Sequence, residues 1–433
     1  MGKGVRRGSA KGRPIGEEVA AAARPEQRLL PVVELLVQAG VALRELVIAT
    51  GTQVLARMLE EDREASCGER YRHDGQRRSY RHGYEQGQAI LGGRKISLRK
   101  PRVRTVAGSE VPLPTWEALQ REDLLRERVL EQMMIGVSTR NYERSLEELP
   151  AGMRSIATKK SSVSRRFVAR TNREVTTFLT RSIEGLDLPV VMIDGTYLGD
   201  HMMLVALGVD RTGAKHVLAV REGTTESHAV CHAMLRDLIH RGLEVERPRL
   251  FVIDGGKGIR KAIVTTFGSW ALIQRCQLHK MRNVLEHLPK AKQDWMRRKL
   301  GEILADEDAE RGRAALERLA ESFQPAHPGA AASLREGLDE MFSVTELGLS
   351  EALHKSLRST NLIENVQGRV KTITRRVKRW RGGSMALRWV VSACMEAERK
   401  FRRIRGHQDM PTLLAALERR ATALGLAVGE ETA

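Results

Sequence analysis

The sequence predicts a multidomain protein of the α/β plus α class, in which helices precede and follow an α/β core. Three observations support this prediction. At roughly 150 residues per domain, 433 residues are enough for two or three domains. Four apolar runs of strand length occur between residues 188 and 254, with one helical stretch between the third and the fourth. On both sides of this region, apolar residues recur at helical spacing.

The composition favours a nucleic acid as partner. The chain carries 73 Lys plus Arg against 54 Asp plus Glu, a net charge of +19, and 41% of its residues are apolar. Its four cysteines form no CxxC pair, which indicates a reducing compartment. Because no signal-peptide core and no run of 18 apolar residues occurs, we expect a cytoplasmic, nucleoid-associated protein without a membrane span. The positive charge fits a polyanion such as DNA.

The N-terminal part of the chain reads as an arm followed by helix. Residues 1–26 are rich in Gly, Ala, Lys and Arg, which predicts a flexible basic arm. Residues 27–69 form a helical unit, because apolar residues recur at helical spacing from Leu43 to Leu59.

Residues 70–183 are expected to form the DNA-binding region. Residues 81–104 read as short basic strands around a Gly-Gly turn, which predicts a hairpin. A helical pattern at 120–149 and a second, basic helix from Ser161 predict a helix-turn-helix-like pair, although an ordinary basic helical hairpin fits equally well. The expected DNA contacts in this region are Arg99, Lys100, Arg102, Arg104, Arg165, Arg166 and Arg170.

The centre of the chain, residues 184–280, predicts the α/β core. The runs LPVVMID, HMMLVALGVD, AKHVLAV and RLFVID have the length and composition of buried strands, and residues 226–240 read as a helix. Residues 281–350 and 351–425 are helical, and the second of these segments is strongly basic. Its expected DNA contacts are Arg369, Lys371, Arg375, Arg376 and Arg379.

Two strands of the expected core end in the same way. Asp194 is followed by Gly195, and Asp254 is followed by Gly255. A carboxylate at the rim of a sheet, beside a glycine that lets a ligand approach the backbone, suits Mg²⁺. The alternative is that each Asp-Gly pair only forms a turn.

Glu364 is a third candidate carboxylate. It lies on a predicted helix next to Asn365 and three residues after Asn361. A lone glutamate in a basic helix is most often a salt-bridge partner, yet no cation occupies the positions three or four residues away. A partner from another helix remains a possible explanation of this residue.

Cys276 and His279 form a Cys-x-x-His pair just after a predicted strand. Such a pair is half of a zinc site, but no second pair stands near it in the sequence, and zinc usually requires four ligands. We therefore favour a structural role or support of an active site.

Taken together, these motifs resemble the mutator-type DDE transposases of bacterial insertion sequences. The resemblance runs from about Tyr80 to Leu417 and is carried by IDGTY, IDGGKGIRKAI, RCQLHKMRNV and STNLIENVQGRVKTITRRVKRW, in this order. It implies an RNase H-like mixed-sheet core that is interrupted by the helical segment 281–350. It also implies that Asp194, Asp254 and Glu364 are catalytic and hold two Mg²⁺ ions, for which Mn²⁺ can substitute.

The resemblance further implies a DNA partner and a reaction. The enzyme would bind the terminal inverted repeats of its element, cleave DNA and transfer the strand into target DNA, as a homodimer or larger assembly on double-stranded DNA. Gly195, Gly255, Cys276, His279, Asn361 and Asn365 would support the site. Two alternatives remain, a metal-dependent nuclease or resolvase of the same fold and a non-catalytic DNA-binding repressor derived from a transposase.

Overall fold

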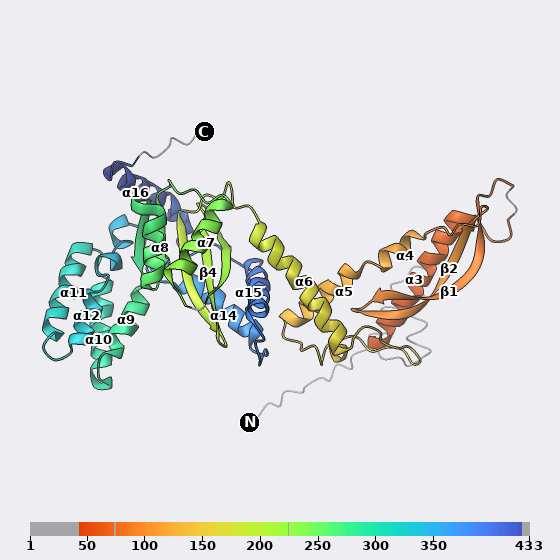
Figure 1. Ribbon diagram of the computed structural model, residues 1–433, viewed down its shortest axis with the longest axis horizontal. Coiled ribbons are helices and arrows are strands. Elements are labelled where there is room, and N and C mark those ends of the chain that lie inside the picture. Colours follow the sequence, from red (N-terminus) through yellow and green to blue (C-terminus); the bar gives the residue numbers. More distant parts are fainter. Residues whose placement is uncertain (1–42, 73–74, 224, 427–433) are drawn as a thin grey trace, which may run out of the picture. The chain divides into compact units, whose positions relative to one another are not determined.

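The computed structural model describes residues 43–72, 75–223 and 225–426, and for residues 43, 44, 122 and 123 it describes the backbone alone. The expected arm, 1–26, and the first part of the helical unit expected at 27–69 lie outside the described residues. The chain divides into two compact units (Figure 1), which are considered separately below. The N-terminal unit consists of the chain up to Gln132 and the segment Val137–Arg166. The C-terminal unit consists of Met133–Gly136 and the chain from Phe167 onward.

The N-terminal unit contains a long helix packed on a two-stranded sheet. Helix α3 (Leu43–Cys67) lies against strands β1 (Ser79–Leu91) and β2 (Arg94–Thr105), which pair antiparallel as the sequence predicts for the basic hairpin. Gly92 and Gly93 make the turn with φ of 56° and 77°, a backbone conformation that glycine adopts readily. The short helix α4 (Pro114–Leu119) packs beside α3.

The two helices expected to form a helix-turn-helix-like pair do not form a compact motif. Helix α5 (Glu122–Met134) and helix α6 (Lys160–Thr180) are separated by residues 135–159, in which the only helical element is a 3₁₀ turn at Glu143–Ser145. Gly136 and Gly152 in this segment adopt positive φ, which breaks a continuous helical path. The connection is therefore much longer than the three or four residues typical of that motif.

The C-terminal unit is built on a mixed five-stranded sheet with the strand order β5-β4-β3-β6-β7. The first three strands along the chain, β3 (Val190–Leu198), β4 (His201–Val209) and β5 (Lys215–Gly223), pair antiparallel. Strands β6 (Arg249–Ile253) and β7 (Ala271–Arg275) run parallel to β3. The mixed α/β core is thus confirmed, and all four predicted strands are present together with β7.

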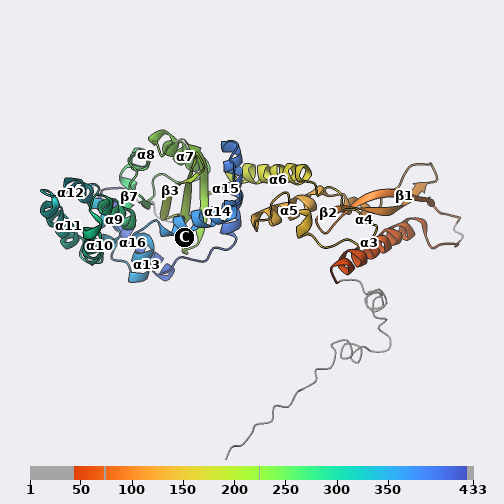
Figure 2. The same ribbon diagram turned by 90° about the horizontal axis from the view of Figure 1, so that it is seen from below.

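Helices cover both faces of this sheet (Figures 1 and 2). On one face, Val191 and Ile193 of β3 join a core with helices α7 (His228–His240) and α8 (Lys257–Phe267). On the other face, Val190 and Met192 join a core with helices α14 (Asn361–Thr374), α15 (Gly383–Glu398) and α16 (Met410–Ala423). This alternation is what a strand buried on both sides requires.

Four helices that follow β7 form a smaller bundle with its own core. They are α9 (Gln277–Glu286), α10 (Lys290–Leu304), α11 (Ala309–Phe323) and α12 (Pro328–Arg335). The chain then returns through the segment 341–347 to α13 (Glu351–Leu357) and α14. The helical character predicted for the segment 281–350 is therefore observed.

Gln274 of β7 connects the sheet to this returning segment. Its side chain is fully buried, its Nε2 donates to the carbonyls of Arg275 and Met341 at 2.7 and 3.0 Å, and its Oε1 accepts from the Val344 N–H at 2.9 Å. Since a buried backbone N–H without a partner is costly, the sequence needs an amide here.

Replacing Gln274 by Ala is expected to lower the free energy of unfolding by about 2–3 kcal/mol, because the buried Val344 N–H loses its acceptor. Urea unfolding measures the change. The exposed Gln408 supplies a control, since Gln408→Ala should change the same quantity by less than about 0.5 kcal/mol. Equal effects of the two substitutions would show that the Gln274 hydrogen bonds do not stabilise the fold.

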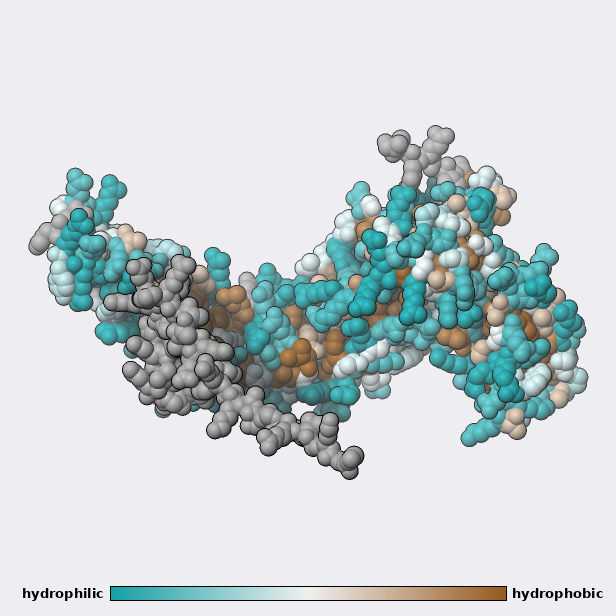
Figure 3. Space-filling view, turned by 180° about the vertical axis from the view of Figure 1, so that it is seen from behind, coloured by the Kyte–Doolittle hydropathy of each residue, from teal (hydrophilic) through white to brown (hydrophobic). Residues whose placement is uncertain are grey.

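Hydrophilic residues cover most of the visible face of the C-terminal unit, which contains the five-stranded sheet (Figure 3). Among the described residues, no helix is both long enough and apolar enough to cross a membrane.

Candidate active site

Asp194 and Asp254 lie side by side on neighbouring parallel strands. Asp254 directly follows the last residue of β6, as expected, but Asp194 lies in the middle of β3, which stays paired with β4 as far as Leu198, so the expectation that this strand ends at Asp194 is wrong. In the register between β3 and β6, Ile193 is paired with Ile253, so the two aspartates that follow are level with each other. Asp194 is buried, with 6% of its surface exposed, and Asp254 is half-buried. The two carboxylates singled out in the sequence are thus neighbours in the sheet.

Glu226 completes a cluster of three carboxylates that the sequence analysis missed. Ligand oxygens of Asp194, Glu226 and Asp254 all lie within 4.8 Å of one another. Glu226 stands in the loop between β5 and α7, directly before Ser227, the N-cap residue of α7. We had assigned it to the predicted helix 226–240; a glutamate directly before an N-cap serine was the signal that could have placed it in a loop.

Crowding of the three carboxylates opposes the ionisation of Asp194 and Glu226. Burial, followed by the charge of Asp254, raises the pKa of Asp194 to about 7. The same two causes raise the pKa of Glu226. Among the described residues, none of the three forms an ion pair with a lysine, arginine or histidine. Like charges this close and this poorly solvated favour either a shared proton or a bound cation.

A second cluster adjoins the first and contains Cys276, His279 and Glu364. Cys276 is the N-cap residue of α9, and Glu364 lies in the first turn of α14. The Nε2 atom of His279 is 3.7 Å from Oε1 of Glu364. Glu364 is also close enough to raise the pKa of Asp194, so the two clusters act on each other.

Thr360, the fully buried N-cap residue of α14, connects the members of this second cluster. Its hydroxyl lies 2.9 Å from Oε1 of Glu364 and 3.3 Å from both Sγ of Cys276 and Nδ1 of His279. Its backbone N–H also donates to Sγ of Cys276 at 3.4 Å. No local pattern selects Thr360, because two of its three partners, Cys276 and His279, lie 84 and 81 residues before it in the sequence.

Cys276 and His279 form a polarised pair. The hydrogen bond with Cys276 raises the pKa of His279, although burial opposes this. Burial alone would raise the pKa of the Cys276 thiol, but hydrogen bonds with His279 and Thr360 outweigh it and lower that pKa. Among the residues that the structure describes, Glu364 is the one other ligand in this cluster, which therefore offers three ligands where structural zinc takes four.

The other residues expected to support the site are two glycines packed against side chains of the protein and two exposed asparagines. At Gly195, a Cβ atom would overlap the carboxylate of Glu226. At Gly255, which has φ of 105°, a Cβ atom would overlap the guanidinium of Arg275. These glycines therefore admit side chains of the protein itself, rather than the ligand that we expected at their backbone. Asn361 and Asn365 are exposed on α14.

The cations expected to contact DNA fall into two groups. Those on and after α14 are exposed: Arg369, Lys371, Arg375, Arg376 and Arg379. In the N-terminal unit, Lys100 pairs with Glu85 at 2.8 Å, and Arg102 pairs with Glu110 at 2.7 Å. The charge of the hairpin is therefore partly neutralised within the hairpin and the segment that follows it.

Three further expected DNA contacts bond to other groups of the protein, and the last two, Arg99 and Arg165, form no ion pair with any described residue. Arg104 lies 4.0 Å from Glu110, Arg166 donates to the Ala157 carbonyl, and Arg170 pairs with Glu174 at 3.4 Å. The exposed guanidinium of Arg99 lies 4.0 Å from the ring centroid of Tyr84, and Arg165 is exposed on α6.

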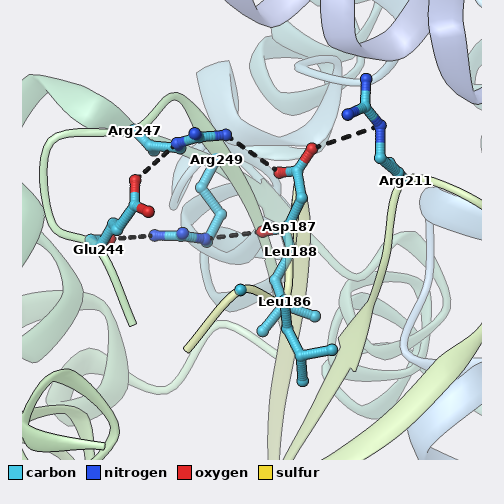
Figure 4. Close-up of a pocket in the computed structure, with 8 residues that line it drawn as sticks. Leu186, Asp187, Leu188, Arg211, Glu244, Arg247 and Arg249 are labelled. Atoms are coloured by element: carbon cyan, nitrogen blue, oxygen red, sulfur yellow. Dashed lines mark hydrogen bonds and ion pairs between the residues drawn. The ribbon is translucent and has the colours of Figure 1, made fainter. Parts of the chain in front are cut away.

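A pocket of about 200 Å³ lies before the first residues of β3 and β6, at the edge of the sheet away from the carboxylates (Figure 4). Its charges are paired with one another: Asp187 lies 3.6 Å from Arg247 and 3.7 Å from Arg211, and Arg247 lies 2.6 Å from Glu244. The buried Arg249 donates to the carbonyls of Leu188 and Glu244. This pairing accounts for the pocket as a structural feature.

The fold and the clusters define a mixed α/β protein with a candidate centre for a divalent metal, built from carboxylates on and beside the neighbouring parallel strands β3 and β6. The chain matches the family "Transposase, Mutator family" over residues 31–404 and belongs to that family. The resemblance found in the motifs is thereby confirmed.

Curated relatives agree with this family. The transposase for insertion sequence element IS256 in transposon Tn4001 of Staphylococcus aureus is 29% identical over 339 residues, which cover 74% of this chain and 82% of the relative. The transposase for insertion sequence element ISRM5 of Rhizobium meliloti is 26% identical over 394 residues, 88% of this chain and 94% of the relative. Among solved structures, the catalytic core domain of BIV integrase is 14% identical to this chain. The match covers 35% of this chain and 82% of the integrase chain, with a TM-score of 0.15.

Proposed function

We propose that this protein is a transposase that binds the terminal inverted repeats of its insertion sequence, cleaves the DNA there and transfers the strand into target DNA. The observation that carries the proposal is the juxtaposition of Asp194 and Asp254 with Glu364 close enough to act on Asp194 electrostatically. The family supplies the class of activity. The mixed sheet of three antiparallel and two parallel strands agrees with the RNase H-like core that we expect.

The residues present fit a divalent metal. Asp194, Glu226 and Asp254 supply hard oxygen ligands and have no cationic side chain paired with them in the described part of the chain. Mg²⁺ prefers such ligands, and Mn²⁺ accepts them. In this proposal Asp194, Asp254 and Glu364 hold the ions during the reaction. Such ions, when bound, activate the attacking hydroxyl and stabilise the charge on the leaving oxygen.

The protein groups around the carboxylates position them. The Thr360 hydroxyl donates to Oε1 of Glu364 at 2.9 Å, and Nε2 of His279, a residue whose pKa is raised, lies 3.7 Å from the same oxygen. The buried Gln367 donates to the Gly195 carbonyl at 3.4 Å, which fixes α14 along β3. These contacts keep Glu364 and Asp194 in one place while DNA is exchanged.

DNA is held by phosphate contacts in this proposal. The exposed cations that follow Glu364 on α14 and beyond lie on the same segment as the candidate site and suit a phosphate backbone. Water would cleave at the element's end, and the freed 3′-hydroxyl would then attack the target DNA. No covalent bond to the protein is required for either step.

The joining step separates a transposase from a nuclease. A labelled DNA end that already carries a free 3′-hydroxyl, taken from the sequence beside the reading frame, is incubated with the protein, Mg²⁺ and a target plasmid. A transposase attaches the label to the plasmid. Cutting without attachment would favour a metal-dependent nuclease or resolvase, and binding without either reaction would favour a repressor.

A further inference from the structure

Glu226 occupies a space that the sequence keeps open beside Asp194. A Cβ atom on Gly195 would overlap Oε1 of Glu226, although the backbone of Gly195 has an ordinary conformation that other residues adopt. The Gly195 N–H donates to Oδ1 of Asp194 at 3.0 Å and also opposes the rise in the pKa of Glu226. Any larger residue at position 195 would therefore push the Glu226 carboxylate away from β3.

Two more glycines fit the Glu226 segment against the start of α8. A Cβ atom on Gly256 would lie 3.2 Å from Oε2 of Glu226 and 3.3 Å from Oδ1 of Asp254. A Cβ atom on Gly258 would overlap the backbone carbonyl of Glu226. The loop before α7 is thus seated closely on the loop that carries Asp254, and the position of Glu226 is fixed by backbone on two sides.

A purely structural role does not explain this arrangement. Ser227 already caps α7 by accepting from the Val230 N–H, so Glu226 is not needed as the cap. Placing Glu226 within 4.8 Å of two other carboxylates costs energy through repulsion and lost hydration unless a cation is present.

Two buried polar groups beside the cluster also lack adequate partners. Asp194 is 94% buried, and within the described part of the chain its carboxylate accepts a hydrogen bond only from the adjacent Gly195 N–H. Thr196, on the same face of β3 two residues further on, is 2% exposed, and its hydroxyl has no partner among the described residues. Such groups are usually satisfied by a ligand or by ordered water.

We propose that Glu226 is a fourth carboxylate of the reaction centre and binds a divalent cation together with Asp194 and Asp254. This inference rests on the proposed function, since it assigns one more ligand to the same centre. It separates two roles: Glu226 belongs to the ion held by Asp194 and Asp254, and Glu364 approaches from α14, beside Cys276 and His279.

Mn²⁺ binding to the full-length chain without DNA tests the inference, with free Mn²⁺ followed by electron paramagnetic resonance. Glu226→Gln should weaken binding by about tenfold or more, because even residues that only support a ligand change metal affinity by about 10–100-fold. Asp194→Asn should weaken it at least as much. Glu321→Gln, at an exposed position of α11, is the matched control and should leave binding unchanged.

A second substitution displaces Glu226 without removing it. Gly195→Ala changes no ligand and requires only that the flexible Glu226 side chain moves, so the protein should fold and bind Mn²⁺ as weakly as Glu226→Gln does. Wild-type affinity in both variants, with loss in Asp194→Asn, would overturn the role of Glu226 and leave the proposed function standing. Absence of saturable binding by the wild type, or full binding by Asp194→Asn, would contradict the proposed metal centre itself.

Discussion

Glu364→Gln protein is expected to join DNA ends at a rate roughly a thousandfold or more below that of the wild type, since metal-assisted charge stabilisation is worth several kcal/mol and each 1.36 kcal/mol is tenfold. Glutamine keeps the size of the side chain and an oxygen that can accept from Thr360. The fold and DNA affinity should therefore be retained. Strand transfer of a labelled end, together with a gel-shift titration, measures both quantities.

Glu418→Gln, at an exposed position of α16, is the control for this substitution and should join DNA like the wild type. Glu364 lies in the cluster with Cys276 and His279, and Asp194 and Asp254 lie in the other cluster, so a catalytic role of Glu364 requires both clusters to act in one reaction. Appreciable joining by Glu364→Gln would remove Glu364 from the catalytic set and leave it as a partner of His279.

The second large effect concerns stability in the absence of metal. Asp194→Asn is expected to be more stable than the wild type at pH 8, with an upper bound of about 4 kcal/mol for a shift from a pKa near 3.8 to one of about 7. Burial and the neighbouring charges of Asp254, Glu226 and Glu364 oppose ionisation of Asp194, and the charge of His279 favours it.

The sign of the pH dependence follows from this raised pKa. The folded protein keeps a proton on Asp194 that the unfolded chain has released, so the stability contributed by the protonated group is full below about pH 4 and is lost as the pH rises through about 7. The advantage of Asp194→Asn should accordingly shrink between pH 8 and pH 5.5. Thermal unfolding in EDTA at both pH values tests this, with the exposed Asp200→Asn as control.

Adding Mn²⁺ at pH 8 should stabilise the wild type and not Asp194→Asn, because a ligand that binds only the folded state raises its stability. Identical pH profiles for the wild type and Asp194→Asn in EDTA would show that the Asp194 carboxylate is not strained in the metal-free protein.

The sheet and two of its acidic residues could be predicted because the relevant signals are local. Buried strands are recognisable as short apolar runs, and Asp194 and Asp254 are marked by the glycines that follow them. Their closeness follows from parallel pairing of β3 with β6. The helix that carries Glu364 was likewise readable from its periodicity.

The other parts of the site depend on contacts between distant segments. Glu226 meets Asp194 only because β5 leads to a loop that crosses Gly195, and Thr360 meets Cys276 only because α14 returns after a separate helical bundle. Neither contact produces a periodic pattern in the sequence from which it could be predicted. The predicted helix-turn-helix-like pair was wrong as a compact motif, since the helical pattern predicted for 120–149 ends at Met134 and the segment that follows contains two glycines with positive φ.

If this chain joins DNA through a metal-dependent carboxylate centre, the Asp254 carboxylate is required for joining. The DNA that flanks the reading frame serves as donor and a plasmid as target, with Mg²⁺, for the wild type and Asp254→Asn. We expect joined product from the wild type alone, with equal binding of the flanking DNA by both proteins. Joined product from Asp254→Asn at the wild-type rate would show that joining does not depend on this carboxylate.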